Sequence, residues 1–226
     1  MRKRITVTAL TTLFVCMLFL AACAPKAARV TDEELRALRT EYPYDDRCGT
    51  ADLRVLESFD DLTDVFLMDC AAVLTLTGDW ERRTVTLAPA DGAEDGPGLE
   101  MTGVLCRARV DRVLCGADFL EGKDEITLYL GSTQTAGMFS LRDVFVPGSQ
   151  LVCLLHRDSA KNPFVEDEAL YSTAKWAAYY LTPEGAVLSV MSMPGLDECS
   201  GLYLDAFAQR LADLPARPDV EEPEDS

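Results

Sequence analysis

Only one stretch of this 226-residue chain is apolar enough to enter a lipid bilayer, and it lies at the N-terminus. Residues 5–22 carry no charged side chain, and Arg2, Lys3 and Arg4 precede them. A positive segment followed by a short apolar run has the layout of a secretory signal. The remaining residues must therefore fold as a water-exposed domain, because a multi-span membrane protein needs several apolar spans.

Four residues at the end of the apolar run indicate how it is processed. Leu20, Ala21, Ala22 and Cys23 resemble the lipobox of bacterial lipoproteins. The resemblance implies that lipoprotein signal peptidase recognises Leu20, Ala21 and Ala22, and that a diacylglycerol is attached to the Cys23 thiol. Two acyl chains anchor a protein stably. We therefore expect an exported protein on the extracytoplasmic face of the cell membrane, without any cofactor besides this lipid. The alternative is an ordinary cleaved signal or an uncleaved N-terminal helix, with Cys23 incidental.

Composition bounds what the rest of the chain can do. Hydrophobic residues make up 48% of the chain, which is enough for a folded core. The net charge of −17 argues against a nucleic-acid partner, which requires a cationic surface. We predict a signal peptide at 1–22, a lipidated tether at 23–30, a single domain at 31–214 and a disordered acidic tail at 215–226.

Helices are predicted at both ends of this domain. Thr31 and Glu34 have the spacing of a capping box, and Pro43 ends the helix that they begin. A second helix is predicted before Pro215. Its apolar face consists of Leu204, Phe207, Ala208 and Leu211.

Between the helices the hydrophobic period is that of β-strands. Seven short strands are predicted at residues 65–76, 80–87, 104–114, 126–130, 150–155, 176–181 and 186–191. The last two are joined by Thr182-Pro183-Glu184-Gly185, a typical turn sequence. This pattern predicts a mainly β fold, either a small OB-like barrel or a curled antiparallel sheet, with an N-terminal and a C-terminal helix.

Several segments resemble exported bacterial lipoproteins of unknown function that contain an OB-like barrel. The resemblance spans residues 58–192 and rests on segments 64–67, 110–116, 126–130 and 146–155 and on the Tyr179-Tyr180 hairpin. It implies a fold and supplies no catalytic residues.

Six cysteines remain once Cys16 and Cys23 are set aside. They are Cys48, Cys70, Cys106, Cys115, Cys153 and Cys199. An even number in an exported chain permits disulfides. Cys70, Cys106 and Cys153 lie in apolar strand segments, where free thiols are favoured. No Cys-x-x-Cys pair occurs, so neither a zinc site nor thioredoxin-like chemistry is indicated.

No catalytic or metal site is predicted. His156 is the one histidine, and it follows a strand without a nucleophile motif beside it, so we interpret it as a rim residue. Asp91 to Gly96 begins like a calcium loop, but Ala93 and Thr102 stand where ligands belong, so an acidic loop is favoured.

Aromatic residues offer one candidate binding surface. OB-type barrels bind oligomers on a strand face, where aromatic side chains stack against the ligand. Trp80, Tyr129, Trp176 and Tyr179 could form such a platform, for a glycan or a peptide because the negative charge disfavours polyanions. The competing interpretation is that they pack inside the fold.

These observations predict a non-enzymatic, lipid-anchored module of the cell envelope that binds a protein or peptide partner. A lipoprotein that captures a small ligand or glycan is the alternative and requires an aromatic pocket. A hydrolase that uses two facing carboxylates is the second alternative.

Overall fold

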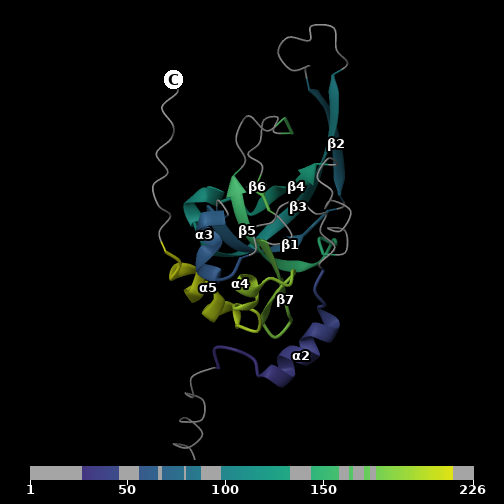
Figure 1. The fold of residues 1–226 in the computed structure, drawn as a ribbon. Coiled ribbons are helices and arrows are strands. Elements are labelled where there is room, and N and C mark those ends of the chain that lie inside the picture. The colour runs from purple at the N-terminus through teal and green to yellow at the C-terminus, as the bar shows by residue number, and fades with distance from the viewer. Residues whose placement is uncertain are drawn as a thin grey trace, which may run out of the picture.

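One strongly curled sheet of eight strands forms the body of the molecule in the computed structural model (Figure 1). The structure describes residues 27–45, 56–65, 68–78, 80–87, 98–132, 144–157, 163–164, 171–173 and 177–215. The strands are β1 Cys70–Leu76, β2 Glu81–Leu87, β3 Leu99–Cys115, β4 Glu125–Ser132, β5 Gln150–Arg157, β6 Tyr171–Ser172, β7 Ala178–Leu181 and β8 Val187–Ser189.

Short helices accompany the sheet. They are α2 Asp32–Glu41, η1 Phe59–Asp61, α3 Leu62–Val65, η2 Ala117–Leu120, α4 Pro194–Asp197 and α5 Leu204–Ala212. The mainly β fold with a helix toward each end is therefore confirmed.

Strand pairing explains the curvature. The strand order is β1-β3-β4-β6-β5-β7-β8, and β1 also pairs with β5, so the pairings return to β1 after five strands. Within these five, the pair β4–β6 is parallel and the others are antiparallel. This order corresponds to an OB-type, partly open barrel. Its weakest seam is β6, which forms two residue pairs with each neighbour.

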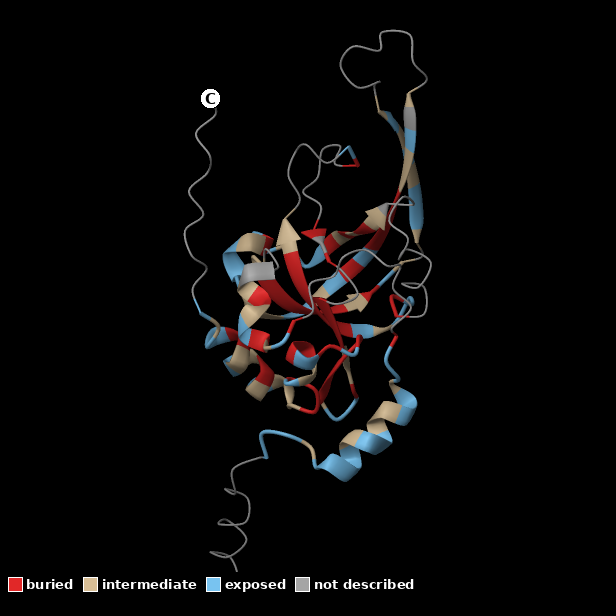
Figure 2. Ribbon diagram, in the orientation of Figure 1, coloured by how far each residue is buried: buried red, intermediate tan, exposed pale blue. Residues whose placement is uncertain are grey.

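The core fills the inside of the curled sheet and the space beneath α4 and α5 (Figure 2). Six of the seven residues of β1 are buried, which agrees with an apolar segment that pairs on both edges. From α5, Phe207 packs against Tyr179 at 4.8 Å and Phe59 at 6.1 Å between ring centroids.

Two elements extend from opposite ends of this body (Figure 1). Strand β2 pairs with the first half of β3 to form a two-stranded arm. Helix α2 lies at the other end, and none of its ten residues is buried. The arm and the helix thus contribute surface rather than core.

The predicted elements differ from the structure in a few places. The strand expected from residue 65 begins at Cys70, because Ser58 and Asp61 form a capping box that starts a helical segment ending at Val65. The turn between β7 and β8 is as predicted, with the Gly185 N–H donating to the Thr182 carbonyl at 2.8 Å. Strand β6 and helix α4 were not predicted, because their segments are too short to show a period. The acidic loop at 91–96 and residues 216–226 of the tail lie outside the described residues.

Candidate functional site: a tyrosine pocket beside helix α2

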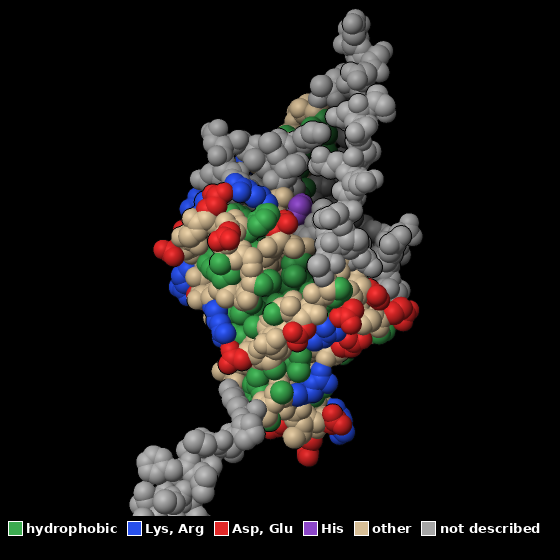
Figure 3. Space-filling model, turned by 90° about the vertical axis from the view of Figure 1, so that its left-hand side faces the viewer, with side chains coloured by type: hydrophobic (Ala, Val, Ile, Leu, Met, Phe, Trp, Pro, Cys, Tyr) green, Lys and Arg blue, Asp and Glu red, His purple; other side chains and the backbone are tan. Residues whose placement is uncertain are grey.

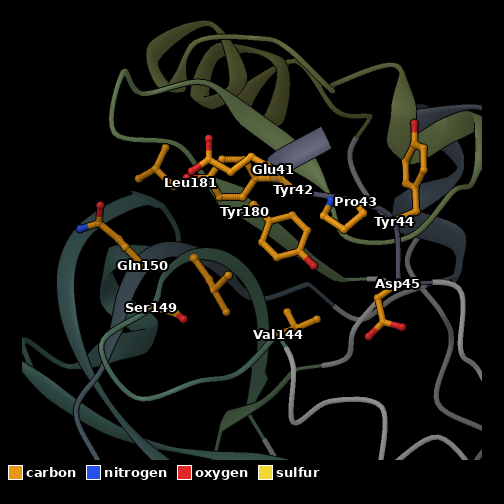
Figure 4. A pocket seen from close by; sticks show the side chains of 11 residues that line it. Glu41, Tyr42, Pro43, Tyr44, Asp45, Val144, Ser149, Gln150, Tyr180 and Leu181 are labelled. Atoms are coloured by element: carbon orange, nitrogen blue, oxygen red, sulfur yellow. The ribbon is translucent and has the colours of Figure 1, made fainter. Parts of the chain in front are cut away.

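A pocket of about 910 Å³ lies between the end of α2 and the curled sheet (Figure 4). This volume falls in the range of ligand sites in proteins. The described lining residues are Glu41, Tyr42, Pro43, Tyr44, Asp45, Val144, Ser149, Gln150, Leu151, Tyr180 and Leu181.

One wall forms where α2 ends. Pro43 disfavours helical geometry at Tyr42, which caps the helix with φ −117° and ψ 69°, outside the helical region. The chain then reaches Asp45, whose N–H donates to the carbonyl of Val190 at 2.8 Å. This bond fixes the segment that carries the wall tyrosines against the sheet.

The opposite wall comes from β7 and the approach to β5. Tyr180 and Leu181 lie on β7, and Ser149 precedes β5. The turn before β5 requires Gly148, which has a left-handed φ of 87° and donates its N–H to the carbonyl of Leu76 at 2.8 Å. The backbone at the end of β1 therefore holds this turn in place.

Two tyrosine rings meet in the pocket. The rings of Tyr42 and Tyr180 are 5.6 Å apart between centroids and tilted by 50°. Tyr44 points away from them (Figure 4), and its hydroxyl donates to the carboxylate of Asp197 at 2.9 Å. The pocket thus offers a pair of adjacent aromatic faces from two separate elements.

Carboxylates give the pocket a negative potential. Glu41 and Asp45 both line it. The pKa of Tyr42 is raised, first by burial and then by the nearby carboxylates of Glu41 and Glu184. The described lining residues include no lysine or arginine. This chemistry favours ligands that are neutral or positively charged.

Arg39 holds helix α2 in place beside the pocket. Its guanidinium donates to the Ser189 carbonyl at 2.8 Å, to the Ser200 hydroxyl at 2.7 Å and to the Asp197 carboxylate at 3.1 Å. The same group lies 3.8 Å from the centre of the Tyr44 ring. These contacts join α2 to β8 and α4, so Arg39 positions the wall that carries Tyr42.

The described members of the predicted stacking platform do not form one cluster, because Trp80 and Tyr179 pack with the main core and Tyr129 packs with a separate small cluster. Trp80 donates its indole N–H to the carbonyl of Phe145 at 2.8 Å, and Tyr129 stacks on Phe164 at 5.4 Å. Tyr179 is fully buried, so its assignment to a surface platform was wrong. It was misassigned because a strand residue facing inward and one facing outward look alike in a short aromatic segment. Trp176 lies outside the described residues.

His156 has a partner that the sequence did not reveal. Its Nδ1 lies 2.6 Å from the Asp69 carboxylate, which also accepts the Arg157 N–H at 3.1 Å. The side chain is 32% exposed, and the ring reaches the surface (Figure 3). Asp69 was missed because it is 87 residues away along the chain. Among the described side chains, only Asp69 bonds to this ring, so the contact joins the start of β1 to the end of β5.

The five described cysteines are free thiols: Cys70, Cys106, Cys115, Cys153 and Cys199. Burial raises the pKa of Cys70, Cys153 and Cys199 to about 12 in each case. These thiols therefore stay protonated and pack as small apolar groups. Cys48 lies outside the described residues.

The predicted lipidation residues Leu20, Ala21, Ala22 and Cys23 also lie outside the described residues. Within the part of the chain that is described, no helix has the length and hydrophobicity needed to cross a bilayer. In the same part, no cluster of three or more His, Cys, Asp or Glu residues is arranged to hold a metal ion.

Comparison with known proteins gives no match: no family model, curated protein or solved structure is significantly similar to this chain.

The sequence did not predict the pocket. The sequence feature that points to the pocket is Tyr42-Pro43-Tyr44, in which two aromatic residues flank a proline at the end of a capped helix.

Proposed function

We propose that this protein is an exported lipoprotein, anchored through a diacylglycerol on Cys23, that binds a protein or peptide partner without chemical conversion. The lipobox resemblance at Leu20 to Cys23 supports the anchor. The observation that carries the binding role is the pocket between α2 and the sheet, with Tyr42 and Tyr180 in contact inside it.

The surface around the pocket supports a peptide partner. Among the described residues, Tyr44 and Val146 are the large hydrophobic side chains left exposed, at 40% and 41%. Tyr44 lines the pocket, and Val146 lies between the lining residues Val144 and Ser149. Tyrosine is enriched at the energetic centres of protein interfaces. An extended peptide can cover the pocket and these exposed residues together.

A small ligand or glycan is the second candidate. The volume of about 910 Å³ and the paired tyrosine rings favour it. The two candidates differ in the surface they cover, because a small ligand would fill the pocket without covering Val146.

Photo-crosslinking tests the binding site in membranes of the producing cells. A photoreactive residue replaces Val146, and the control places it at Glu100, an exposed position on the arm. We expect a polypeptide adduct at position 146 that disappears when Tyr180→Leu is added. Equal adducts at both positions, or an adduct unaffected by Tyr180→Leu, would contradict the peptide site. No adduct at either position would favour the small-ligand or glycan alternative, because such a ligand would not cover Val146.

The anchor is tested separately by Cys23→Ala. We expect the unchanged protein to be membrane-bound with an added acyl mass, and the variant to lack that mass. A Cys23→Ala protein that is processed at the same bond and remains in the membrane would exclude the lipid anchor.

A further inference from the structure

The aromatic pair in the pocket is accompanied by negative charge. Tyr42 lies close enough to Glu41 and Glu184 for both carboxylates to influence its ionisation. Tyr180 packs on Tyr42, and Asp45 lines the same cavity. An aromatic face beside carboxylates attracts a cation in two ways, through the ring quadrupole and through direct charge attraction.

We infer that the pocket recognises an arginine or lysine side chain of the peptide partner. This inference rests on the proposed binding function and adds the chemistry of the recognised group. The ring pair contacts the aliphatic stem and the face of the cation, while Glu41 and Glu184 balance its charge. Pro43 and Leu151 supply apolar contact for the rest of the segment.

The protein already uses this chemistry next to the pocket. The guanidinium of Arg39 lies over the ring of Tyr44 at 3.8 Å and donates to Asp197 at 3.1 Å. Tyr44 itself donates to the same carboxylate. A ring and a carboxylate therefore hold a guanidinium together at this end of the molecule, and the pocket presents the same two kinds of group.

The charge of the whole molecule acts in the same direction. With a net charge of −17, the protein attracts basic segments and repels acidic ones before contact. Arginine suits the pocket better than lysine, because its planar guanidinium stacks on aromatic rings and pairs with carboxylates through two N–H groups.

A pair of small probes isolates the charge. N-acetyl-arginine amide and N-acetyl-citrulline amide have nearly the same shape, but citrulline is neutral. In a magnetic resonance titration of the folded protein, we expect the arginine probe to shift the amide signals of Tyr42 and Leu181. We expect it to bind at least about fivefold more tightly than the citrulline probe, with the difference shrinking at high salt.

Two double variants that remove the same number of charges test whether the arginine probe binds in this pocket. Glu41→Gln combined with Glu184→Gln removes the two carboxylates near Tyr42. Glu57→Gln combined with Glu100→Gln removes two exposed acids that neither line the pocket nor influence the ionisation of Tyr42. Arginine-probe affinity should fall by about fivefold or more in the first variant and by less than about twofold in the second.

Three results would overturn the inference: equal binding of both probes, equal losses in both variants, or no detectable binding of the arginine probe. None of them decides the proposed function, because the crosslink at position 146 tests peptide binding independently of charge. A Tyr180-dependent adduct combined with equal probe binding would retain the peptide site and exclude the cation.

Discussion

Strand β1 buries six of its seven residues, whereas helix α2 buries none of its ten. The strand is held by apolar contacts on its faces and by pairing with β3 and β5 on its edges. The helix itself is attached through Arg39, which reaches Ser189, Asp197 and Ser200. On either side of the helix, backbone hydrogen bonds from Val30 to Gly201 and from Asp45 to Val190 add to this attachment. The sheet therefore derives its stability from buried area, and the helix derives its position from a few polar bonds.

This difference separates global from local stability. Elements with few buried contacts open at lower free energy than the core of the same protein. Changes in the core should shift unfolding of the whole domain, and changes at the attachment of α2 should release the helix while the barrel stays folded.

Phe207→Ala should destabilise the whole domain by about 3–5 kcal/mol. Phe207 is fully buried between Tyr179 and Phe59, so its removal leaves a cavity in the core. Urea unfolding measures the loss. Gln209→Ala, an exposed change on the same helix, serves as control and should stay within about 0.5 kcal/mol. A small effect of Phe207→Ala would show that the core is not the main source of stability.

Arg39→Ala should free α2 at a cost of about 2 kcal/mol, the range expected for hydrogen bonds to a charged group. Hydrogen exchange of the α2 amides should accelerate strongly, while exchange in β1 should change little. Arg36→Ala is the matched control, because Arg36 is exposed on the same helix. Acceleration in β1 as large as that in α2 would mean that the helix and barrel unfold as one unit.

Alkaline pH should weaken the barrel through Cys153. Burial raises the pKa of this thiol from 9.0 to about 12. Below pH 9 both folded and unfolded states keep the proton, and between pH 9 and 12 only the unfolded state loses it. The free energy of unfolding therefore falls as the pH rises from 9 to 12, by about 1.4 kcal/mol per pH unit from Cys153. In Cys153→Ala, the free energy of unfolding should depend on pH less steeply by this amount. Identical slopes in the unchanged protein and the variant would show that Cys153 does not cause this pH dependence.

Thr31→Ala should cost α2 about 1 kcal/mol. The Thr31 hydroxyl accepts the Glu34 N–H at 3.3 Å and donates to the Glu34 carboxylate at 2.8 Å. The change removes both of these bonds and leaves the bond from the Thr31 backbone N–H to Glu34. About fivefold faster exchange in the first turn would register the loss. Thr40→Ala, an exposed change near the other end of the helix, should leave the first turn unaffected.

Local signals in the sequence predicted local structure well. The capping box at Thr31 and the proline at 43 bounded α2, and the alternating residues before Leu87 marked β2. Pairings between distant segments were not predictable in this way. The parallel contact of β6 with β4 involves two residue pairs, and neither segment carries a signal for the other.

The candidate site was harder to predict than the fold for the same reason. Tyr42 and Tyr180 are far apart in sequence, and their contact depends on how α2 docks. That docking depends on Arg39, whose partners come from β8 and α4. The aromatic pattern of the strands predicted a surface position for Tyr179, although its neighbour Tyr180 is the one that lines the pocket. Adjacent strand residues point to opposite sides, and one sequence does not show which side is the interior.

The attachment of α2 through Arg39 has a thermodynamic consequence for binding. A ligand that touches both Tyr42 and Tyr180 can bind only to molecules in which the helix is docked. Its apparent dissociation constant is therefore the intrinsic constant divided by the docked fraction. By the same linkage, ligand binding tightens the hold of Arg39 on β8 and α4, although none of these contacts belongs to the pocket itself.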